Sequence, residues 1–208
     1  MQEIQALLDL SSARHSHLCP RQVLGVRMAL VGAATLGLEL PRKDKNLLVI
    51  AETDGCFVDG LEVAAGGFTG RRPLSIEGHG EVGATFINVS TGESVRLAPR
   101  LHDRQRAQEY APFEPRHYFA QLVGYQLMPD QELFSITSVT LTPTIEQIVS
   151  RPGVRVNCSV CGEEIINERE VYYQGSSYCR ACFGQGYYHP KDVIFSVQMV
   201  GDKIFSHS

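Results

Sequence analysis

The chain has 208 residues, 43% of them hydrophobic, a formal net charge of -4 at pH 7 and a pI near 6.0. This length predicts one main domain with a small appendage, and the composition is sufficient to bury a core. The acidic balance argues against a protein whose whole surface is built to bind nucleic acid, while a local basic patch stays compatible with it.

Nothing in the sequence predicts a membrane span or a secretion signal. The longest uncharged apolar run, residues 28–38, is far shorter than the roughly 20 residues that a membrane helix needs. Residues 1–13 lack a basic segment followed by a long apolar core, and they predict a short amphipathic helix instead. We therefore expect a cytoplasmic protein without a membrane partner.

Two predicted helices each begin next to a cysteine. Apolar residues recur at helical spacing over residues 20–38, and Pro20 suits a first helical turn, so Cys19 is expected at a helix N-terminus. An apolar strand is predicted over residues 47–53, and a second helix begins at Cys56. The unsatisfied N–H groups of a helix N-terminus favour an anion, so we expect a lowered pKa for the Cys19 thiol.

The next elements predict a hairpin followed by helices and one more strand. Residues 82–88 and 93–98 flank a turn containing Gly92, which is typical of two antiparallel strands. Helices are predicted over residues 100–108 and 114–127, a strand over residues 133–141 and a short helix ending near Ser150. The turn that follows at residues 151–153 predicts a domain boundary, with domains at residues 1–151 and 152–208.

Four cysteines near the C-terminus form two Cys-x-x-Cys pairs. Cys158 and Cys161 are separated from Cys179 and Cys182 by 17 residues, which is typical of a four-cysteine zinc site. Because thiolates fill all four positions, the expected role of the zinc ion is structural. The alternatives are two redox dithiols or buried thiols. The strand pair predicted over residues 170–178 makes the segment resemble a treble-clef zinc finger.

The zinc-finger segment is also rich in aromatic residues, with arginine and lysine nearby. The aromatic residues are Tyr172, Tyr173, Tyr178, Phe183, Tyr187 and Tyr188. Aromatic side chains beside basic ones can stack on and neutralise nucleic acid, but in a metal-clipped module they can equally form the core. A partner protein, an interdomain contact and nucleic acid therefore all remain open as roles for the finger.

The first half of the chain holds a second group of metal-capable side chains. His17 and Cys19 are ligands for borderline or soft metals, and Cys56 and Asp59 complete a mixed site if the two helix starts converge. Fewer than four protein ligands would leave a position for a substrate. The alternative is that each cysteine packs as a small hydrophobic side chain at its helix start.

Two segments carry a family resemblance. HSHLCPRQVLGVRMA resembles the motif His-Gly-His-x-Cys-Pro-Gly followed by a Leu-Gly-x-Arg helix, and AETDGCFVDGLEVAAGGFTGRRPL resembles its partner Glu-Thr-Asp-x-Cys-x-x-Asp-Ala-x-Gln. Both are similar to the FmdE family, named for a component of formylmethanofuran dehydrogenase. The resemblance covers about residues 10–150, and the C-terminal segment resembles the accessory finger of some members.

The resemblance implies an α+β core domain, with a mixed or antiparallel sheet and helices, followed by a treble-clef zinc finger. It implies intertwined homodimers and a cleft that holds a second metal ion. Carried over by position, the cleft residues are His15, His17, Cys19, Asp54, Cys56, Asp59 and Arg71.

The chain departs from the family pattern at three positions. Phe68 stands where members often have a cysteine, Arg71 where they have a lysine, and Arg21 where a glycine follows the Cys-Pro pair. The missing thiol argues against a cysteine-rich metal site or a redox role. Arginine in place of lysine exchanges a proton donor for a permanent cation.

Several cleft residues have a structural alternative. Asp54 could cap the helix that follows it, which is a common role for aspartate. Asp59 lies on either an exposed helix face or the cleft, and we favour the cleft. Arg71 and Arg72 could clamp an anionic group or belong to a solvated loop. His79, between two glycines, could close the cleft.

Two hypotheses follow. The first is a metal-dependent FmdE-like protein of one-carbon or methanogenesis-type metabolism that binds a small molecule in its cleft. If it is an enzyme, Cys19 and Cys56 serve as ligands or one as nucleophile, His17 as ligand or base and Arg71 as anion clamp, with Asp59 at the same site. The second is an accessory or regulatory protein whose finger binds a partner protein or nucleic acid. The sequence leaves catalysis open.

Overall fold

The structure is a computed structural model that describes residues 2–42, 44–66, 74–149, 151 and 153–188. The chain divides into two compact units, Met1–Val149 and Ser150–Ser208, and each is described by itself. Within the described residues, no helix combines the length and the apolar character that crossing a membrane would require.

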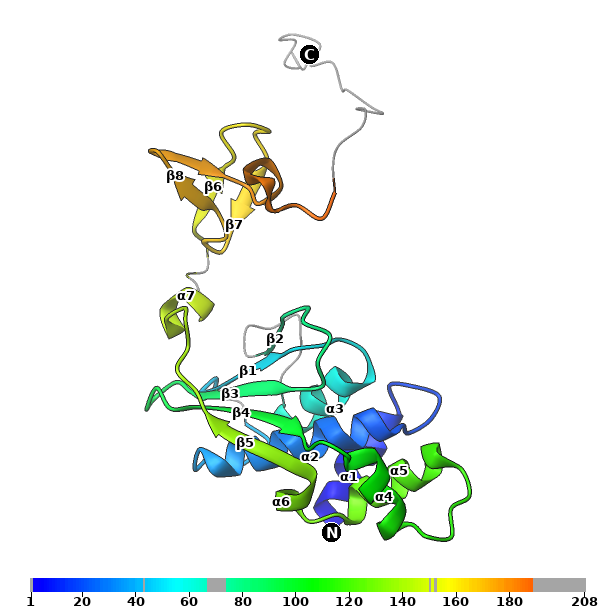
Figure 1. Cartoon of the computed structure of the whole chain (residues 1–208). Coiled ribbons are helices and arrows are strands. Elements are labelled where there is room, and N and C mark those ends of the chain that lie inside the picture. Colours follow the sequence, from blue (N-terminus) through cyan, green and yellow to red (C-terminus); the bar gives the residue numbers. More distant parts are fainter. Residues whose placement is uncertain (1, 43, 67–73, 150, 152, 189–208) are drawn as a thin grey trace, which may run out of the picture. The chain divides into compact units, whose positions relative to one another are not determined.

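A five-stranded mixed sheet forms the centre of the first unit (Figure 1). Its strands, in spatial order, are β2 (Leu74–Ile76), β1 (Leu47–Ala51), β3 (Ala84–Asn88), β4 (Ser94–Pro99) and β5 (Phe134–Ser138). β1 pairs with β2 in parallel and with β3 antiparallel, and the other pairs are antiparallel. The mixed sheet with helices agrees with the expected α+β core.

Seven helices accompany this sheet in the described part of the first unit. They are α1 (Gln2–Ser12), α2 (Pro20–Thr35), α3 (Cys56–Ala65), α4 (Asp103–Tyr110), α5 (His117–Leu127), α6 (Asp130–Leu133) and α7 (Ile145–Val149). Figure 1 shows α2 and α3 lying along one face of the sheet. Both are rich in buried apolar residues because they pack between the sheet and other helices.

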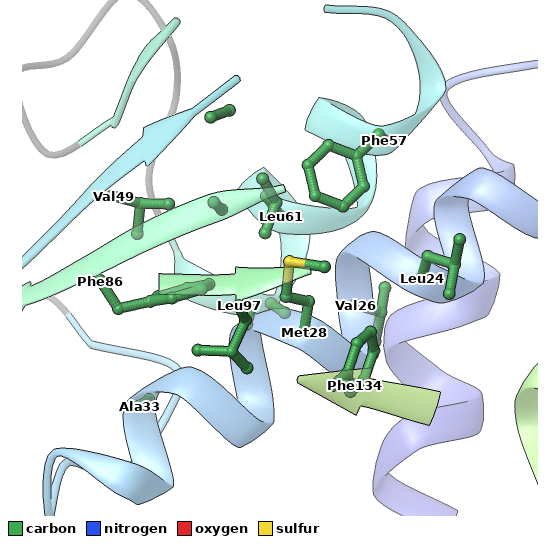
Figure 2. Packing of buried hydrophobic residues seen from close by; sticks show 14 of the residues in the cluster. Leu24, Val26, Met28, Ala33, Val49, Phe57, Leu61, Phe86, Leu97 and Phe134 are labelled. Carbon is green, nitrogen blue, oxygen red and sulfur yellow. The ribbon is translucent and has the colours of Figure 1, made fainter. Parts of the chain in front are cut away.

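Apolar side chains from both helices and from the sheet fill the core (Figure 2). Met28 of α2 and Leu61 of α3 are fully buried, together with Phe86 of β3 and Leu97 of β4. Burial of one such side chain stabilises the fold by about 1.5–3 kcal/mol. Gly32 brings α2 close to the sheet, since a Cβ there would lie 2.5 Å from Cδ2 of Phe86.

A pair of glycines lets α2 and α3 cross in close contact. A Cβ at Gly25 would lie 2.2 Å from the carbonyl oxygen of Phe57, and a Cβ at Gly60 would lie 2.3 Å from that of Gln22. No real side chain fits at such distances. The crossing therefore depends on both glycines, and it lies in the N-terminal halves of the two helices.

The structure confirms the main predicted elements and corrects several boundaries. The hairpin is present as β3 and β4, while the helix expected over residues 20–38 ends at Thr35 and is followed by Gly37 with φ of 67°. The strand expected over residues 133–141 spans only Phe134–Ser138, and Leu133 is the last residue of the helical turn α6. The short parallel strand β2 was not predicted.

The described residues of the second unit, 151 and 153–188, form two small antiparallel hairpins and one irregular helical turn. The hairpins are β6 (Arg155–Asn157) with β7 (Glu164–Ile166) and β8 (Val171–Tyr173) with β9 (Ser176–Tyr178), and the turn is η1 (Ala181–Gln185). The predicted strand pair is confirmed, with its turn at Gln174 and Gly175, both at positive φ. The cysteines lie beside these short elements, consistent with a small zinc-binding module.

Candidate functional site

Cys19 lies at the N-cap of α2, as the sequence predicts, with Pro20 at the first helical position. Its backbone N–H donates to Oε1 of Gln22 at 2.8 Å, and its side chain accepts from the backbone N–H of Gln22. Nε2 of the fully buried Gln22 donates in turn to the carbonyl oxygen of Ser11 at 2.8 Å. Gln22 thus connects the end of α1 to the start of α2 and holds Cys19 between them.

The expectation of a lowered pKa for Cys19 is wrong. Burial raises the pKa of the Cys19 thiol, the backbone N–H of Gln22 opposes that rise, and the neighbouring Cys56 adds to it. Cys19 is only 8% exposed, so desolvation of the thiolate outweighs the helix N-terminus. The same interaction shows that the two thiols lie next to each other.

A second group gathers around Cys56, the first residue of α3. Ligand atoms of His15, Cys56 and Asp59 all lie within 4.8 Å of one another. Nε2 of His15 is 2.5 Å from Oδ2 of Asp59, and the adjacent Arg14 forms an ion pair with Glu62. Because Cys56, Asp59 and Glu62 are three residues apart, they share one face of α3. The loop after α1 is therefore fastened along that face.

Asp54 does not cap the helix that follows it. The N-cap of α3 is Gly55, at φ of 75°, and no side chain caps the helix. The Asp54 side chain is exposed and is absent from the cluster around Cys56.

A cavity of about 680 Å³ adjoins the thiols, which is a size typical of small-molecule sites. His17, Cys19 and Cys56 line it, whereas His15 and Asp59 do not, so Cys56 belongs to both the cavity and the cluster. The apolar part of the wall consists of Pro20, Leu24, Val82, Ala98 and Pro99. The polar part consists of Arg21, Glu81, Arg96, Asp103, Arg104, Tyr118, Gln121 and Tyr125.

A buried carboxylate organises one side of this wall. Glu52 is 6% exposed and accepts two bonds from Arg96, Nε to Oε1 at 2.7 Å and Nη2 to Oε2 at 2.5 Å. Nη2 of Arg96 also contacts Oε2 of Glu81 at 2.9 Å. Glu52 raises the pKa of Arg96, and Gly83 makes room for the pair, since a Cβ there would lie 2.7 Å from Oε2 of Glu52.

A second polar pair joins α4 to α5 at the cavity. The hydroxyl of Tyr125 donates to Oδ2 of Asp103 at 2.5 Å, and the ring is almost fully buried. Burial is the main reason that the pKa of Tyr125 is raised, and the Asp103 carboxylate adds to it. Tyr125 therefore stays protonated and holds Asp103 in place.

Sequence reasoning did not single out these polar wall residues. The sequence offers one indication of a buried ion pair, which is that the charged Glu52 directly follows an apolar strand. Arg96 reaches the wall through its register opposite Thr85 on β3, and Tyr125 follows helical spacing typical of core residues.

The four C-terminal cysteines converge, as their spacing predicts. Their sulfurs lie within 4.8 Å of one another, and those of Cys161 and Cys179 are 3.8 Å apart. Two thiolates bound at about 2.3 Å to a tetrahedral zinc ion would be about 3.8 Å apart. The cluster therefore fits a metal ion of this kind.

Backbone N–H groups and neighbouring thiols set the acidity of this cluster. The N–H groups of Cys161 and Cys179 lower the pKa of Cys158 to about 6, whereas the adjacent Cys179 raises the pKa of Cys182 to about 12. Cys158 therefore forms a thiolate readily, whereas the neighbouring thiols make a thiolate at Cys182 less favourable. A dication between the sulfurs would offset that repulsion.

Comparison with known proteins identifies the core. The FmdE family, described as "FmdE, Molybdenum formylmethanofuran dehydrogenase operon", matches residues 14–135, which is more than half of the chain. The chain belongs to the FmdE family. The FmdE match includes both cysteine-to-helix segments and the polar wall of the cavity.

Two further proteins resemble this FmdE chain. A tungsten formylmethanofuran dehydrogenase FmdE-like protein from Syntrophus aciditrophicus shares its fold, with a TM-score of 0.56 and 18% identity over 89% of this chain and 95% of that one. A "Probable S-adenosyl-L-methionine-binding protein" from Archaeoglobus fulgidus is 31% identical over 98 residues, which are 46% of this chain. The match spans only 27% of that relative.

The structure describes only some of the remaining residues that were expected to form the cleft. Phe68, at the position of the missing thiol, and Arg71, the expected anion clamp, lie outside the residues that the structure describes. His79, which was expected to close the cleft, is exposed and does not line the cavity. The structure thus brings His15, Cys56 and Asp59 together, with Cys19 beside Cys56. His17, the histidine expected as a metal ligand, lines the cavity and is not a member of this cluster.

Proposed function

We propose that this FmdE protein binds a metal ion through His15, Cys56 and Asp59, with Cys19 beside them, and binds a small molecule of one-carbon or methanogenesis-type metabolism in the adjoining cavity. The observation that carries this proposal is the position of Cys56, which is both a member of the cluster and a wall residue of the cavity. A ligand in the cavity would lie next to the metal site.

The donor set supports a borderline metal such as zinc. An imidazole nitrogen, a thiolate sulfur and a carboxylate oxygen are all ligands of Zn²⁺, and three protein ligands leave one tetrahedral position open. When bound, such an ion would polarise an oxygen of the ligand or lower the pKa of a bound water. The ion pair of Arg14 with Glu62 supports the site by holding His15 against α3.

The other residues have proposed roles that follow from their places. Cys19 lies beside Cys56 and could add a fourth ligand or contact the bound molecule as a nucleophile, and His17 faces the cavity as a candidate base. The anion clamp proposed for Arg71 stays a prediction from the family resemblance. Catalysis requires a bound substrate, so binding is the first property to test.

Metal analysis of the purified full chain tests this function. We expect two ions per chain, one of which is lost in Asp59→Asn and in the double variant Cys19→Ser, Cys56→Ser. Asp54→Asn is the matched control, because Asp54 is exposed and outside the cluster, and it should keep both ions. One ion per chain that survives the core substitutions and disappears in Cys158→Ser would overturn the core site.

The second candidate function, an accessory protein, is supported by the exposed aromatic side chains of the four-cysteine module. Tyr172 is 71% exposed and Tyr187 is 99% exposed, far more than core residues would be. Such rings can stack on bases or fill pockets of a partner protein. Retention of single-stranded nucleic acid at low salt should fall in a Tyr172→Ala, Tyr187→Ala variant, and unchanged retention would exclude stacking by these rings.

We also propose that the chain forms a homodimer, as the family resemblance implies. Two large apolar side chains near the cavity helices support an interface, since Leu101 is 83% exposed and Phe113 is 96% exposed. Light scattering should give twice the chain mass, and Phe113→Glu should shift it toward the monomer. A monomeric mass for the unaltered chain would exclude the dimer.

A further inference from the structure

Three arginines line the cavity, and they differ in how their charge is matched. The Arg96 guanidinium is held by Glu52 and Glu81 on two sides. Within the part of the chain that the structure describes, neither Arg21 nor Arg104 forms an ion pair with a carboxylate. Two cationic groups thus reach the cavity with their charge unmatched by the protein.

The acids of the wall are already engaged. Glu81 binds Arg96, and Asp103 accepts a hydrogen bond from the Tyr125 hydroxyl at 2.5 Å. The positive charge of Arg104 works against the rise in the Tyr125 pKa, so its guanidinium acts at the same wall. A cationic ligand would have to displace an existing partner from one of these acids, whereas an anionic ligand would not.

The rest of the wall favours a ligand with an apolar body. Leu24, Val82 and Pro99 contribute apolar surface, and Gln121 and Tyr118 contribute neutral polar groups. Because the wall also carries the carboxylates of Glu81 and Asp103, a strongly charged dianion would meet repulsion as well as attraction. A single negative charge on an apolar frame fits this mixture best.

We propose that the cavity takes an organic carboxylate, with its carboxylate group bound by Arg21 and Arg104 and its apolar body packed beside Leu24 and Val82. This proposal rests on the proposed function of the cavity as a small-molecule site. The planar guanidinium fork matches a carboxylate through two parallel hydrogen bonds. Cys19 and Cys56 line the same cavity, so the bound molecule would also lie near the proposed metal site.

The proposal is tested by measuring the affinities of benzoate and benzamide for the full chain with NMR or calorimetry. The two probes have the same ring and nearly the same size and differ in charge. We expect benzoate to bind at least about tenfold more tightly than benzamide. Arg21→Gln and Arg104→Gln should each weaken benzoate binding by about fivefold, and the double variant should bring benzoate to the level of benzamide.

Two controls separate this site from general charge effects. Arg116→Gln removes the same charge at a residue that stacks on Phe119 outside the cavity wall, and it should leave benzoate affinity unchanged. Inorganic phosphate at matched ionic strength should compete more weakly than a second carboxylate. A benzoate affinity that equals the benzamide affinity, an absence of benzoate binding, equal losses in Arg116→Gln and Arg104→Gln, or stronger binding of phosphate would each overturn the proposal.

The Asp59→Asn variant distinguishes this inference from the metal proposal. Asp59 belongs to the metal cluster but does not line the cavity, so Asp59→Asn should lose the ion and keep its preference for benzoate over benzamide. If the preference disappears together with the ion, the carboxylate binds the metal and the assignment to the arginines is wrong. If the ion is absent from the start while the preference remains, the metal proposal fails alone.

Discussion

The two cysteine sites of this protein differ in how the chain treats negative charge on sulfur. In the C-terminal cluster, backbone N–H groups lower the pKa of Cys158 to about 6. In the core, burial raises the pKa of Cys19 even though it lies at a helix N-terminus. The first site favours a thiolate by its own backbone, whereas the second keeps a neutral thiol unless a cation lies beside it.

The sites also differ in whether they leave room for another molecule. The C-terminal cluster has four sulfurs that fit one tetrahedral ion, so no position remains for a ligand. The core cluster has three members and shares Cys56 with a cavity of about 680 Å³. A cluster with four protein ligands can only stabilise the fold, whereas a cluster with three can also bind another molecule. Cysteines can therefore serve two different purposes in this chain.

The largest expected effect on stability comes from removing one cysteine of the C-terminal cluster. Cys158→Ser should unfold the module, because we expect so small a unit to depend on an ion bound by the four cysteines. Such binding contributes on the order of 10 kcal/mol in small zinc domains. Hydrogen exchange of the amides of β6 to β9 measures the result. Cys56→Ser is the control and should leave these amides protected. Unchanged protection in Cys158→Ser would show that the ion is not structural.

The second effect comes from separating the helices that assemble the core cluster. Gly25→Ala places a Cβ 2.2 Å from the carbonyl oxygen of Phe57, so α2 and α3 must move apart, at a cost of about 3 kcal/mol. Gly78→Ala is the matched control, since nothing lies within 4 Å of its Cβ. Urea denaturation should show the loss only for Gly25→Ala, together with weaker metal retention in the core. Equal stability of the two variants would contradict the tight crossing.

Some features of the two sites are predictable from the sequence alone, and others are not. The helices after Cys19 and Cys56 and the hairpin around Gly92 were predictable, because their periodicity and turn residues are local properties. The four-cysteine cluster was predictable because spacing alone brings Cys-x-x-Cys pairs to one ion. The fold class followed from the family resemblance.

The cavity was not predictable, because its wall depends on long-range register. Arg96 lies opposite Thr85 only once β3 and β4 have paired, and its partner Glu52 comes from beyond the end of β1. The Cys19 pKa was mispredicted for a related reason, since the helix N-terminus is visible in the sequence and the burial that outweighs it is not. The sequence favoured His17 as the metal-ligating histidine, whereas the structure places His15 in the cluster. His15 contacts Asp59 only because the loop after α1 folds back onto α3, which no local pattern predicts.

The third prediction concerns the buried carboxylate of the cavity wall. Glu52→Gln keeps the shape of the side chain but removes the charge that holds Arg96, and it should destabilise the core by about 2 kcal/mol. Glu81→Gln removes a carboxylate that is 67% exposed and contacts the same guanidinium, so its cost should stay below about 1 kcal/mol. Thermal unfolding of both variants decides the matter. A larger loss for Glu81→Gln would show that Glu52 is not the anchor of this wall.

The smallest effect concerns the hydroxyl of Tyr125, and it depends on pH. Tyr125→Phe keeps the buried ring but leaves Asp103 without its donor, which should cost about 1 kcal/mol at neutral pH. The pKa of Tyr125 is raised in the folded protein above its unfolded value near 10. The protonated hydroxyl therefore contributes fully below about pH 10, and its contribution is lost as the pH rises through the higher folded pKa. Urea denaturation at pH 8 and at about pH 10.5 should show the difference between the two proteins shrinking with pH. A difference that grows over this interval would mean that Tyr125 ionises more easily in the folded state, and Asp103 could not then be its acceptor.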